Sequence, residues 1–358
     1  IDIEGLSGVR SLSHVSFAMV EQATNTAISI VELPETRLNH SLVVARVMEA
    51  IMRNNAFFED KVNIGIIAAL LHDKQTPASG DATKSLDPAV FQEEDHWREN
   101  LDEEAWELIE GTGADFEMID EIIHNRGVLG EILDIADKIG YVMLDVKQIG
   151  LDPVIRDLGN IYKDVRYDKV RDEVYFTDPE RLKVFLGIRA KLFRDVYINP
   201  YSQSIDYIFA RLLSPYYSRD ENEEGQLLPE QLRVITDDDL KKFLAEKYGV
   251  EPWFMFDTKN GWFPDFVHCT SEEEANERAE EVKQDPENKF IGIKRGYGFN
   301  SATDFKVKDP ESGTIMPFKQ YEPLFAKALD QTAERTKGYF VVYTKRLDPD
   351  WAVFIPEA

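Results

Sequence analysis

An apolar helical run over residues 62–71 ends in His72 and Asp73, and this junction constrains the chain more than any other feature. A buried helix has little reason to end in two adjacent polar side chains unless they bind something. An imidazole nitrogen and a carboxylate oxygen together suit a hard or borderline divalent cation. Two residues do not fill the coordination sphere of a metal ion, so further ligands are expected elsewhere in the chain.

Two other residues fit a metal site with this pair. His40 stands at the start of an apolar helical run, and Asp137 lies in an otherwise apolar helical segment. Burying an unpaired carboxylate costs several kcal/mol or shifts its pKa. Together with His72 and Asp73, these residues predict a mixed nitrogen and oxygen site for Mn, Fe, Co, Ni, Zn or Mg, with positions left for water and substrate. The alternative is that both histidines are core residues hydrogen-bonded to nearby carboxylates.

The length and charge of the chain limit its functions. Its 358 residues, 43% of them apolar, are enough for one large or two modest domains. With 41 Lys and Arg against 67 Asp and Glu, the net charge of −26 argues against binding to nucleic acid or to an anionic membrane. The single cysteine, Cys269, fits a reducing cytoplasmic setting. We expect no membrane span, since no run of 18 apolar residues occurs, and no signal peptide.

Hydrophobic periodicity predicts a mainly helical body. The stretch 74–88, with Pro77, Gly80 and Pro88, is typical of a loop, and 217–227 of a solvated polar loop. A break is expected at Pro200, because proline disfavours helix at the residue before it. The predicted helices lie within 9–33, 42–52, 61–72, 89–112, 116–125, 128–149, 179–213 and 237–248.

The pattern changes after residue 250. Helices are predicted at 271–283 and 321–336, among short aromatic and β-branched runs typical of strands. These runs lie at 253–256, 290–293, 305–307, 339–343 and 351–355. We therefore predict a helical domain over 1–249 and a smaller α+β domain over 250–358.

The order of the four candidate ligands resembles that of the HD-domain phosphohydrolases, whose fold is a helical bundle around one or two metal ions. Residues 37–45, R-L-N-H-S-L-V-V-A, look like the R-x-x-H-S-L-x-V-A segment of the deoxynucleoside triphosphate triphosphohydrolases. Residues 137–145 match the D-K-x-x-Y-x-x-x-D pattern of that group, and 189–197 match its R-x7-Y segment. The resemblance covers about residues 10–215. It implies a nucleotide substrate and a homo-oligomer, to which the C-terminal part could contribute an interface.

Helical spacing gives the D-K-x-x-Y-x-x-x-D segment a physical meaning of its own. Asp137, Tyr141 and Asp145 are four residues apart and lie along one stripe of a helix. Asp137 can bind the metal, Tyr141 can pack on a sugar or base, and Asp145 can accept a hydrogen bond from a sugar hydroxyl. Lys138 can hold a phosphate as a point charge. The alternatives are core packing for Tyr141 and a solvated helix face for Asp145 and Lys138.

Three more residues are candidates for substrate binding. Arg37 and Arg189 can bind phosphate oxygens in bidentate fashion, and Tyr197 can stack on a base. The alternative for the arginines is a structural salt bridge in an acid-rich protein. For Tyr197 it is ordinary core packing.

The segment after His72-Asp73 departs from the triphosphohydrolase pattern H-D-x-G-H-x-P-F-x-H. Thr76 and Asp81 stand where its two histidines would be. The H-D-x-x-E-x-x-x-G-D pattern of the 5′-deoxynucleotidases fits at Gly80-Asp81, but Thr76 replaces its glutamate. We take His96 and Asp81 as the candidate catalytic acid–base residues.

Three functions follow. The first, which the resemblance implies, is a deoxynucleoside triphosphate triphosphohydrolase, in which a metal-activated water would attack the α-phosphorus and release nucleoside and triphosphate. The second is a 5′-nucleotidase-like phosphomonoesterase, which the Gly80-Asp81 match favours. The third is a nucleotide-binding regulatory protein that has lost its acid–base residues.

Overall fold

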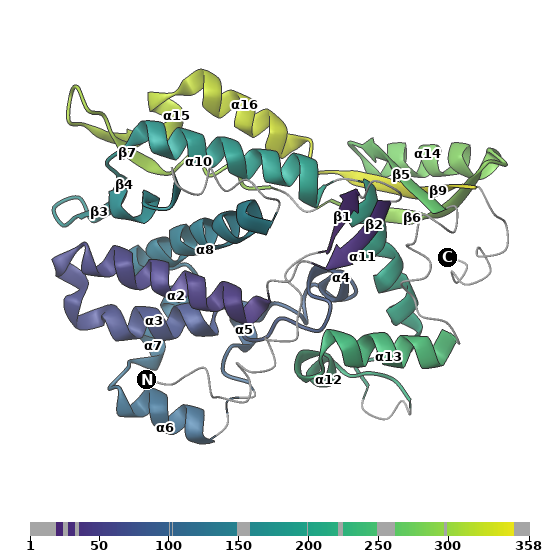
Figure 1. Ribbon diagram of the computed structural model, residues 1–358, viewed down its shortest axis with the longest axis horizontal. Coiled ribbons are helices and arrows are strands. Elements are labelled where there is room, and N and C mark those ends of the chain that lie inside the picture. Colours follow the sequence, from purple (N-terminus) through teal and green to yellow (C-terminus); the bar gives the residue numbers. More distant parts are fainter. Residues whose placement is uncertain are drawn as a thin grey trace.

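The chain forms a mainly helical body with a smaller sheet-containing C-terminal part, which confirms the predicted fold class (Figure 1). The computed structural model describes residues 19–23, 28–32, 36–99, 101, 103–148, 158–198, 200–220, 225–248, 262–296 and 299–346. The predicted strands at 253–256 and 351–355 lie outside these ranges. Within the described residues, none of the helices has both the length and the apolar character that a membrane crossing requires.

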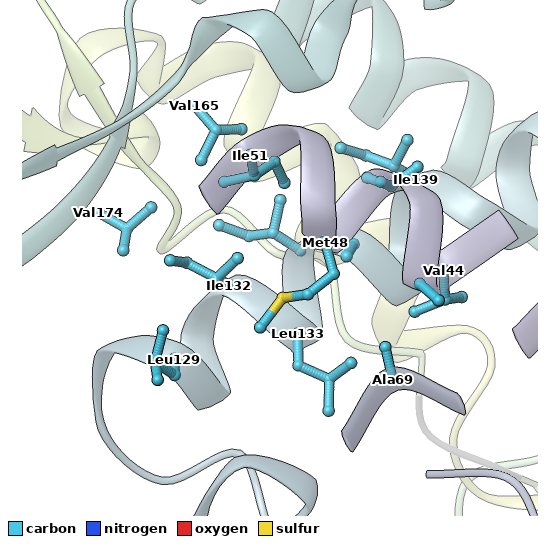
Figure 2. Packing of buried hydrophobic residues seen from close by; sticks show 14 of the residues in the cluster. Val44, Met48, Ile51, Ala69, Leu129, Ile132, Leu133, Ile139, Val165 and Val174 are labelled. Atoms are coloured by element: carbon cyan, nitrogen blue, oxygen red, sulfur yellow. The ribbon is translucent and has the colours of Figure 1, made fainter. Parts of the chain in front are cut away.

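Three helices form the centre of the body. Helix α2 (Arg37–Arg53) packs against α3 (Val62–Leu71) and α8 (Gly127–Gln148). Thr36 caps α2, since its side-chain oxygen accepts a hydrogen bond from the backbone N–H of Asn39 at 3.2 Å. Helix α3 is apolar and largely buried, as expected for a helix enclosed by its neighbours. Figure 2 shows the resulting core, which α2 and α8 fill with Val44, Met48, Ile51, Ile132, Leu133 and Ile139.

A glycine lets α8 approach α2 closely. A Cβ atom placed at Gly140 would lie 2.9 Å from Cγ2 of Val44, and 3.7 Å from Cε1 of His40. Contacts under 3.0 Å do not occur for real Cβ atoms, so a side chain here would push the two helices apart. The missing side chain of Gly140 therefore brings the helix of Asp137 next to the helix of His40.

Shorter elements surround these helices. The 3-10 helix η3 (Ala56–Lys61) links α2 to α3, and α4 (Asp81–Lys84) lies inside the stretch predicted to be a loop. The predicted helix over 89–112 divides into α5 (Glu93–His96) and α6 (Glu103–Gly111), followed by α7 (Phe116–Ile123).

The second half of the body has a break in its helices close to the one predicted at Pro200. Helix α10 (Pro179–Leu192) runs into the π-helical turn η5 (Phe193–Tyr197), and α11 begins at the proline (Pro200–Leu213). Helix α8 contacts α10 as well as α2, and α16 (Pro323–Glu334) packs on α10 (Figure 1). The remaining elements here are η6 (Ser214–Tyr216), α12 (Pro229–Val234) and α13 (Asp237–Tyr248).

Two small sheets involve the C-terminal part. Strands β5 (Trp262–Cys269), β9 (Tyr339–Arg346) and β6 (Asn288–Arg295) form one antiparallel sheet in that order, with α14 (Glu272–Gln284) packed against it. The other sheet has the order β3-β4-β7-β8; along the chain η4 comes directly before β3 and α15 directly after β8. Its strands are β3 (Val165–Asp168), β4 (Glu173–Phe176), β7 (Lys306–Lys308) and β8 (Ile315–Pro317). The adjoining helices are η4 (Ile161–Asp164) and α15 (Phe318–Tyr321).

The second sheet joins the two halves of the chain. Phe176 of β4 pairs in parallel with Val307 of β7. Val307, Phe318 and Leu329 belong to the same buried cluster as the residues of α2 and α8. The division of the chain at residue 250 itself stays a prediction.

One sequence prediction is wrong, and several strands were not predicted. The helix over 9–33 is wrong for its described residues, which form the antiparallel strands β1 (Met19–Ala23) and β2 (Ile28–Glu32). Residues 28–32 read Ile-Ser-Ile-Val-Glu, and such β-branched residues favour strands. The hairpin of β3 and β4 was not predicted, because four-residue strands leave too short a pattern to recognise. Strand β5 was not predicted either.

Candidate metal centre

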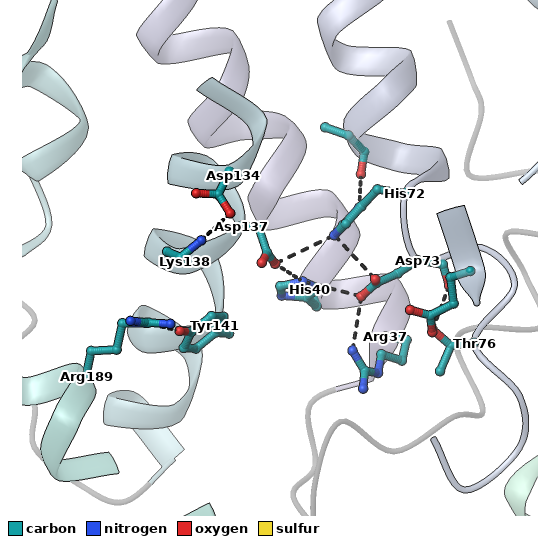
Figure 3. Close-up of polar contacts among 12 residues, drawn as sticks. Arg37, His40, His72, Asp73, Thr76, Asp134, Asp137, Lys138, Tyr141 and Arg189 are labelled. Atoms are coloured by element: carbon teal, nitrogen blue, oxygen red, sulfur yellow. Dashed lines mark hydrogen bonds and ion pairs between the residues drawn. The ribbon is translucent and has the colours of Figure 1, made fainter. Parts of the chain in front are cut away.

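The four candidate ligands meet at one place in the fold (Figure 3). Nε2 of His40 lies 2.9 Å from Oδ1 of Asp137 and 3.5 Å from Oδ2 of Asp73. Nε2 of His72 lies 3.5 Å from Oδ1 of Asp73 and 3.6 Å from Oδ1 of Asp137. One ligand atom each of His40, His72 and Asp73 lies within 4.8 Å of the other two. These residues could hold a metal ion.

Three helices deliver these side chains. His40 stands in the first turn of α2, His72 and Asp73 directly follow α3, and Asp137 lies in the middle of α8. His40 is 2% exposed, whereas 34% of the Asp137 side chain is exposed. The centre is therefore closed on the side of α2 and open beside Asp137, as a site that admits a substrate requires.

The hydrogen bonding of His72 suits a metal ligand. Its Nδ1 lies 2.8 Å from the carbonyl oxygen of Ala69. A carbonyl oxygen only accepts, so Nδ1 carries the proton and the lone pair of a neutral ring is on Nε2. Nε2 is buried and faces carboxylate oxygens of Asp73 and Asp137 at 3.5 and 3.6 Å. A cation between these atoms, either a proton or a metal ion, balances their charge, so the residues fit a divalent metal.

The pKa values in the centre are shifted by the attraction between its histidines and its carboxylates. Burial disfavours a charged His72, but the Asp73 carboxylate and then Asp137 outweigh this and raise its pKa to about 9. Burial would raise the pKa of Asp137, but hydrogen bonding to His40 and His72 holds it well below its usual value. The pKa of Asp73 is also lowered, because His72 and Arg37 outweigh the effect of burial. Both carboxylates are therefore ionised at neutral pH.

Arg37 contacts this centre through Asp73. Its NH1 donates to Oδ2 of Asp73 at 3.0 Å, and its NH2 lies 4.0 Å from Oδ1 of Asp81. Burial opposes the charge of Arg37, but Asp73 raises its pKa, so the guanidinium stays charged. Arg37 thus orients a candidate ligand, and its role in phosphate binding stays a prediction.

Two of the predicted substrate residues are bonded to each other. Nε of Arg189 donates to the hydroxyl of Tyr141 (Figure 3). Its NH1 donates to the backbone carbonyl oxygen of Asn300. The Arg189 guanidinium also lies 4.6 Å from the ring centroid of Phe299. The C-terminal part of the chain therefore holds Arg189, and Arg189 holds Tyr141.

Of the other predicted substrate residues, Lys138 and Asp145 are buried and Tyr197 is partly buried. Lys138 pairs with Asp134, one turn earlier on α8, and lies 5.7 Å from the ring centroid of Phe305. Asp145 is 1% exposed, and the ring of Tyr197 packs edge-on against Phe193 at 4.9 Å. Substrate contacts by Lys138, Asp145 and Tyr197 stay predictions.

The two catalytic candidates differ in their relation to the centre. Nδ1 of His96 contacts Oε1 of Glu99 at 2.6 Å, and among the described residues no hydrogen bond or ion pair joins His96 to the four ligands. Asp81 lies near Arg37 and 3.6 Å from Nζ of Lys84, with 62% of its side chain exposed. The protein around this exposed carboxylate desolvates it in part, which raises its pKa, but Lys84 and then Arg37 outweigh this and lower the pKa of Asp81.

Sequence reasoning missed two charged residues next to the centre. Oε2 of Glu93 lies 2.7 Å from Nζ of Lys84, and the hydroxyl of Thr76 contacts its Oε1. Glu93 stands in the acidic run Glu-Glu-Asp at the start of α5, which is typical of a solvated helix end. Nothing in that run distinguishes the one buried acid from its neighbours.

Comparisons with known proteins support the fold. No protein-family model and no curated protein matches the sequence. A hypothetical protein from Aquifex aeolicus matches with a TM-score of 0.64 and 16% identity, over 98% of this chain and 93% of that chain. A phosphohydrolase from Bacteroides thetaiotaomicron matches with a TM-score of 0.65 and 11% identity, over 96% and 94%. At these identities the likeness is one of fold.

Proposed function

We propose that this chain is a metal-dependent phosphohydrolase that acts on nucleotides, with a deoxynucleoside triphosphate as the favoured substrate. One observation carries the proposal: two imidazoles and two carboxylates from three helices meet within ion-pair distance at His40, His72, Asp73 and Asp137. The likeness in fold to a bacterial phosphohydrolase supports the reaction class. The R-x-x-H-S-L-x-V-A and D-K-x-x-Y-x-x-x-D segments support the nucleotide.

The residues at the centre would have two roles, to hold the metal ion and to orient one of its ligands. His40, His72, Asp73 and Asp137 would hold the cation, which when bound supplies a Lewis acid for a phosphoryl oxygen and activates a water. Arg37 fixes the Asp73 carboxylate through its 3.0 Å hydrogen bond.

Tyr141 lies one turn beyond Asp137 on the same helix face, in reach of a sugar bound at the centre. Arg189 fixes the direction of the Tyr141 hydroxyl, and Asn300 and Phe299 fix Arg189. The nucleoside side of the site is thereby preorganised before substrate binds.

A panel of deoxynucleotides tests the proposal. The purified chain is incubated with each nucleotide and with Mn, Co or Mg, and the products are separated by chromatography. We expect deoxynucleoside and triphosphate from a triphosphate substrate, and loss of turnover in His72→Ala. A wild-type chain with metal demonstrably bound that hydrolyses none of the nucleotides would contradict the proposal.

The position of Asp81 favours a second candidate, a phosphomonoesterase acting on deoxynucleoside monophosphates. Asp81 ends the Gly80-Asp81 match, and its carboxylate lies 4.0 Å from Arg37 at the edge of the centre. The same panel separates the two reactions, since the monoesterase releases inorganic phosphate from monophosphates. Tight nucleotide binding without turnover would instead favour a regulatory protein.

A further inference from the structure

Glu93 is a buried acid linked to a candidate metal ligand through one hydroxyl group. Its side chain is 9% exposed. The Thr76 hydroxyl contacts Oε1 of Glu93 and also lies 2.8 Å from the backbone carbonyl oxygen of Asp73. Figure 3 shows Thr76 beside Asp73 and Arg37. Glu93 therefore lies beside the centre, although it comes from a different part of the chain.

The contacts of Thr76 indicate where a proton belongs. A hydroxyl carries one hydrogen, and here it faces two oxygens that accept hydrogen bonds. If the Thr76 hydroxyl donates its hydrogen to the carbonyl of Asp73, it has none left for Glu93. A protonated Glu93 carboxyl can then donate to the oxygen of Thr76, so that both contacts are hydrogen bonds. Burial raises the pKa of Glu93 and so favours the same protonated form. Lys84 lowers this pKa and Asp73 raises it, and the net shift is upward.

The proposed reaction needs a proton donor. Both candidate reactions break the bond between phosphorus and the 5′ oxygen of the sugar. An alkoxide is a poor leaving group, so a positioned acid must protonate that oxygen as the bond breaks. Asp81 is unsuited to this task, because its neighbours Lys84 and Arg37 hold it ionised.

We propose that Glu93 is the general acid of this centre, an inference that rests on the proposed function. A water oxygen forms its bond to phosphorus while the bond from phosphorus to the 5′ oxygen breaks. The proton of Glu93 passes to the 5′ oxygen, which leaves as an alcohol. The Glu93 carboxylate then takes up the proton that the attacking water has lost, and the centre returns to its starting state.

The groups that face Glu93 fit this role. Lys84 of α4 lies 2.7 Å from one oxygen, and Thr76 holds the other. Asp73 and Arg37, from the end of α3 and the start of α2, also act on its charge. Lys84 stabilises the carboxylate that remains after the proton has left, and Thr76 fixes its direction.

The first test compares Glu93→Gln with Glu131→Gln. Glu131 lies on α8, and burial raises its pKa too, but its neighbours are Lys306 and Val174. We expect Glu93→Gln to lower kcat by about 100-fold or more, since a positioned acid contributes 10²–10⁴-fold. Metal content and KM should stay close to those of the wild type. Glu131→Gln should retain wild-type turnover.

A change of leaving group makes the test specific. The p-nitrophenyl ester of a deoxynucleoside 5′-phosphate releases p-nitrophenolate, which needs no proton. We expect Glu93→Gln to hydrolyse this ester with less than a 10-fold loss, against at least 100-fold for the nucleotide. Equal losses on the two substrates would overturn the role of Glu93 as an acid.

A pH profile and a double variant separate catalysis from a structural ion pair. A required acid makes kcat fall as pH rises through the pKa of Glu93, and this fall should be absent in Glu93→Gln. If Glu93 only neutralised Lys84, the variant with both Glu93→Gln and Lys84→Gln would recover turnover. We expect that it does not, and that Glu93→Asp restores part of kcat.

Failure of the two proposals can be told apart. A wild-type chain without turnover on any nucleotide would overturn the proposed function, and the role of Glu93 with it. Wild-type turnover together with at least half of kcat in Glu93→Gln would overturn the role of Glu93 alone.

Discussion

Asp137 connects both histidines of the centre through a single oxygen, Oδ1. Replacing it by asparagine keeps its size but removes the charge that a divalent cation requires. We expect Asp137→Asn to lower metal affinity at least 10-fold and to abolish turnover, as measured by metal analysis after dialysis and by the nucleotide panel. Asp134→Asn, one turn away and bonded to Lys138, should keep its metal. Equal metal content in both variants would contradict the assignment.

Arg37 and Asp73 form a buried ion pair whose side chains are 11% and 12% exposed. Removing one partner leaves the other charge buried, which typically costs 3–5 kcal/mol. We expect Arg37→Met to lower the free energy of unfolding of the metal-free chain by about 3 kcal/mol in urea titrations. The double variant with Asp73→Asn should recover part of this loss. An unchanged unfolding midpoint in Arg37→Met would show that the pair contributes little.

At the scale of elements, the contact between α2 and α8 places Asp137 next to His40. Gly140→Ala would bring a Cβ atom to 2.9 Å from Val44, and such overpacking costs about 1–3 kcal/mol. We expect a lower unfolding midpoint and weaker metal binding, both partly restored by Val44→Ala. Gly111 in α6 has no atom within 4 Å of the same added Cβ. Gly111→Ala should therefore leave stability equal or slightly higher.

The loop after α4 is tied to the segment after η6. Asp87 accepts hydrogen bonds from the side chains of Arg219 and Tyr217. Burial raises the pKa of Asp87, but Arg219 and Tyr217 outweigh it, so its folded pKa lies below the unfolded value. The stabilisation is therefore present above the unfolded pKa near 4 and is lost as pH falls through the folded pKa.

We expect Asp87→Asn to be less stable than the wild type at pH 6, by about 1 kcal/mol, and to approach it below pH 3. Urea unfolding measured between pH 2.5 and 7 checks this. Asp304→Asn, which changes an exposed partner of Lys319, is the control and should follow the wild-type pH dependence. Parallel curves for wild type and Asp87→Asn would contradict the assigned direction.

At the scale of the whole molecule, the two halves of the chain share one core. Val307 pairs with Phe176, and Asn300 binds Arg189. We expect residues 1–249 alone to lose cooperative unfolding and to bind a hydrophobic dye, because they would expose the surface that Phe318 and Leu329 cover. Circular dichroism with urea titration measures this. A cooperative transition would show instead that residue 250 begins an independently folding domain.

The sequence predicted the helices, and the candidate ligands that meet at the centre, better than the strands and the burial of Glu93. Helical periodicity located α3 and α8, because long amphipathic or apolar runs leave a strong local pattern. An N-cap signature located α13. The histidines and aspartates of the centre were found because they interrupt such runs. Glu93 interrupts nothing, and its burial depends on Thr76 and Lys84, which only the folded chain brings to it. The strands β1 to β4 have five residues or fewer and so carry little pattern, but β5 was missed although it has eight residues.

The hydrogen bond between Arg189 and Asn300 has a consequence for the order in which the site forms as the chain is synthesised. Residue 137 completes the ligand set, whereas the carbonyl that seats Arg189 belongs to Asn300, 163 residues later (300 − 137). At about 5–20 residues per second, a ribosome needs on the order of ten to thirty seconds for that interval. A nascent chain therefore contains all four candidate metal ligands well before the residue that binds Arg189 has been synthesised.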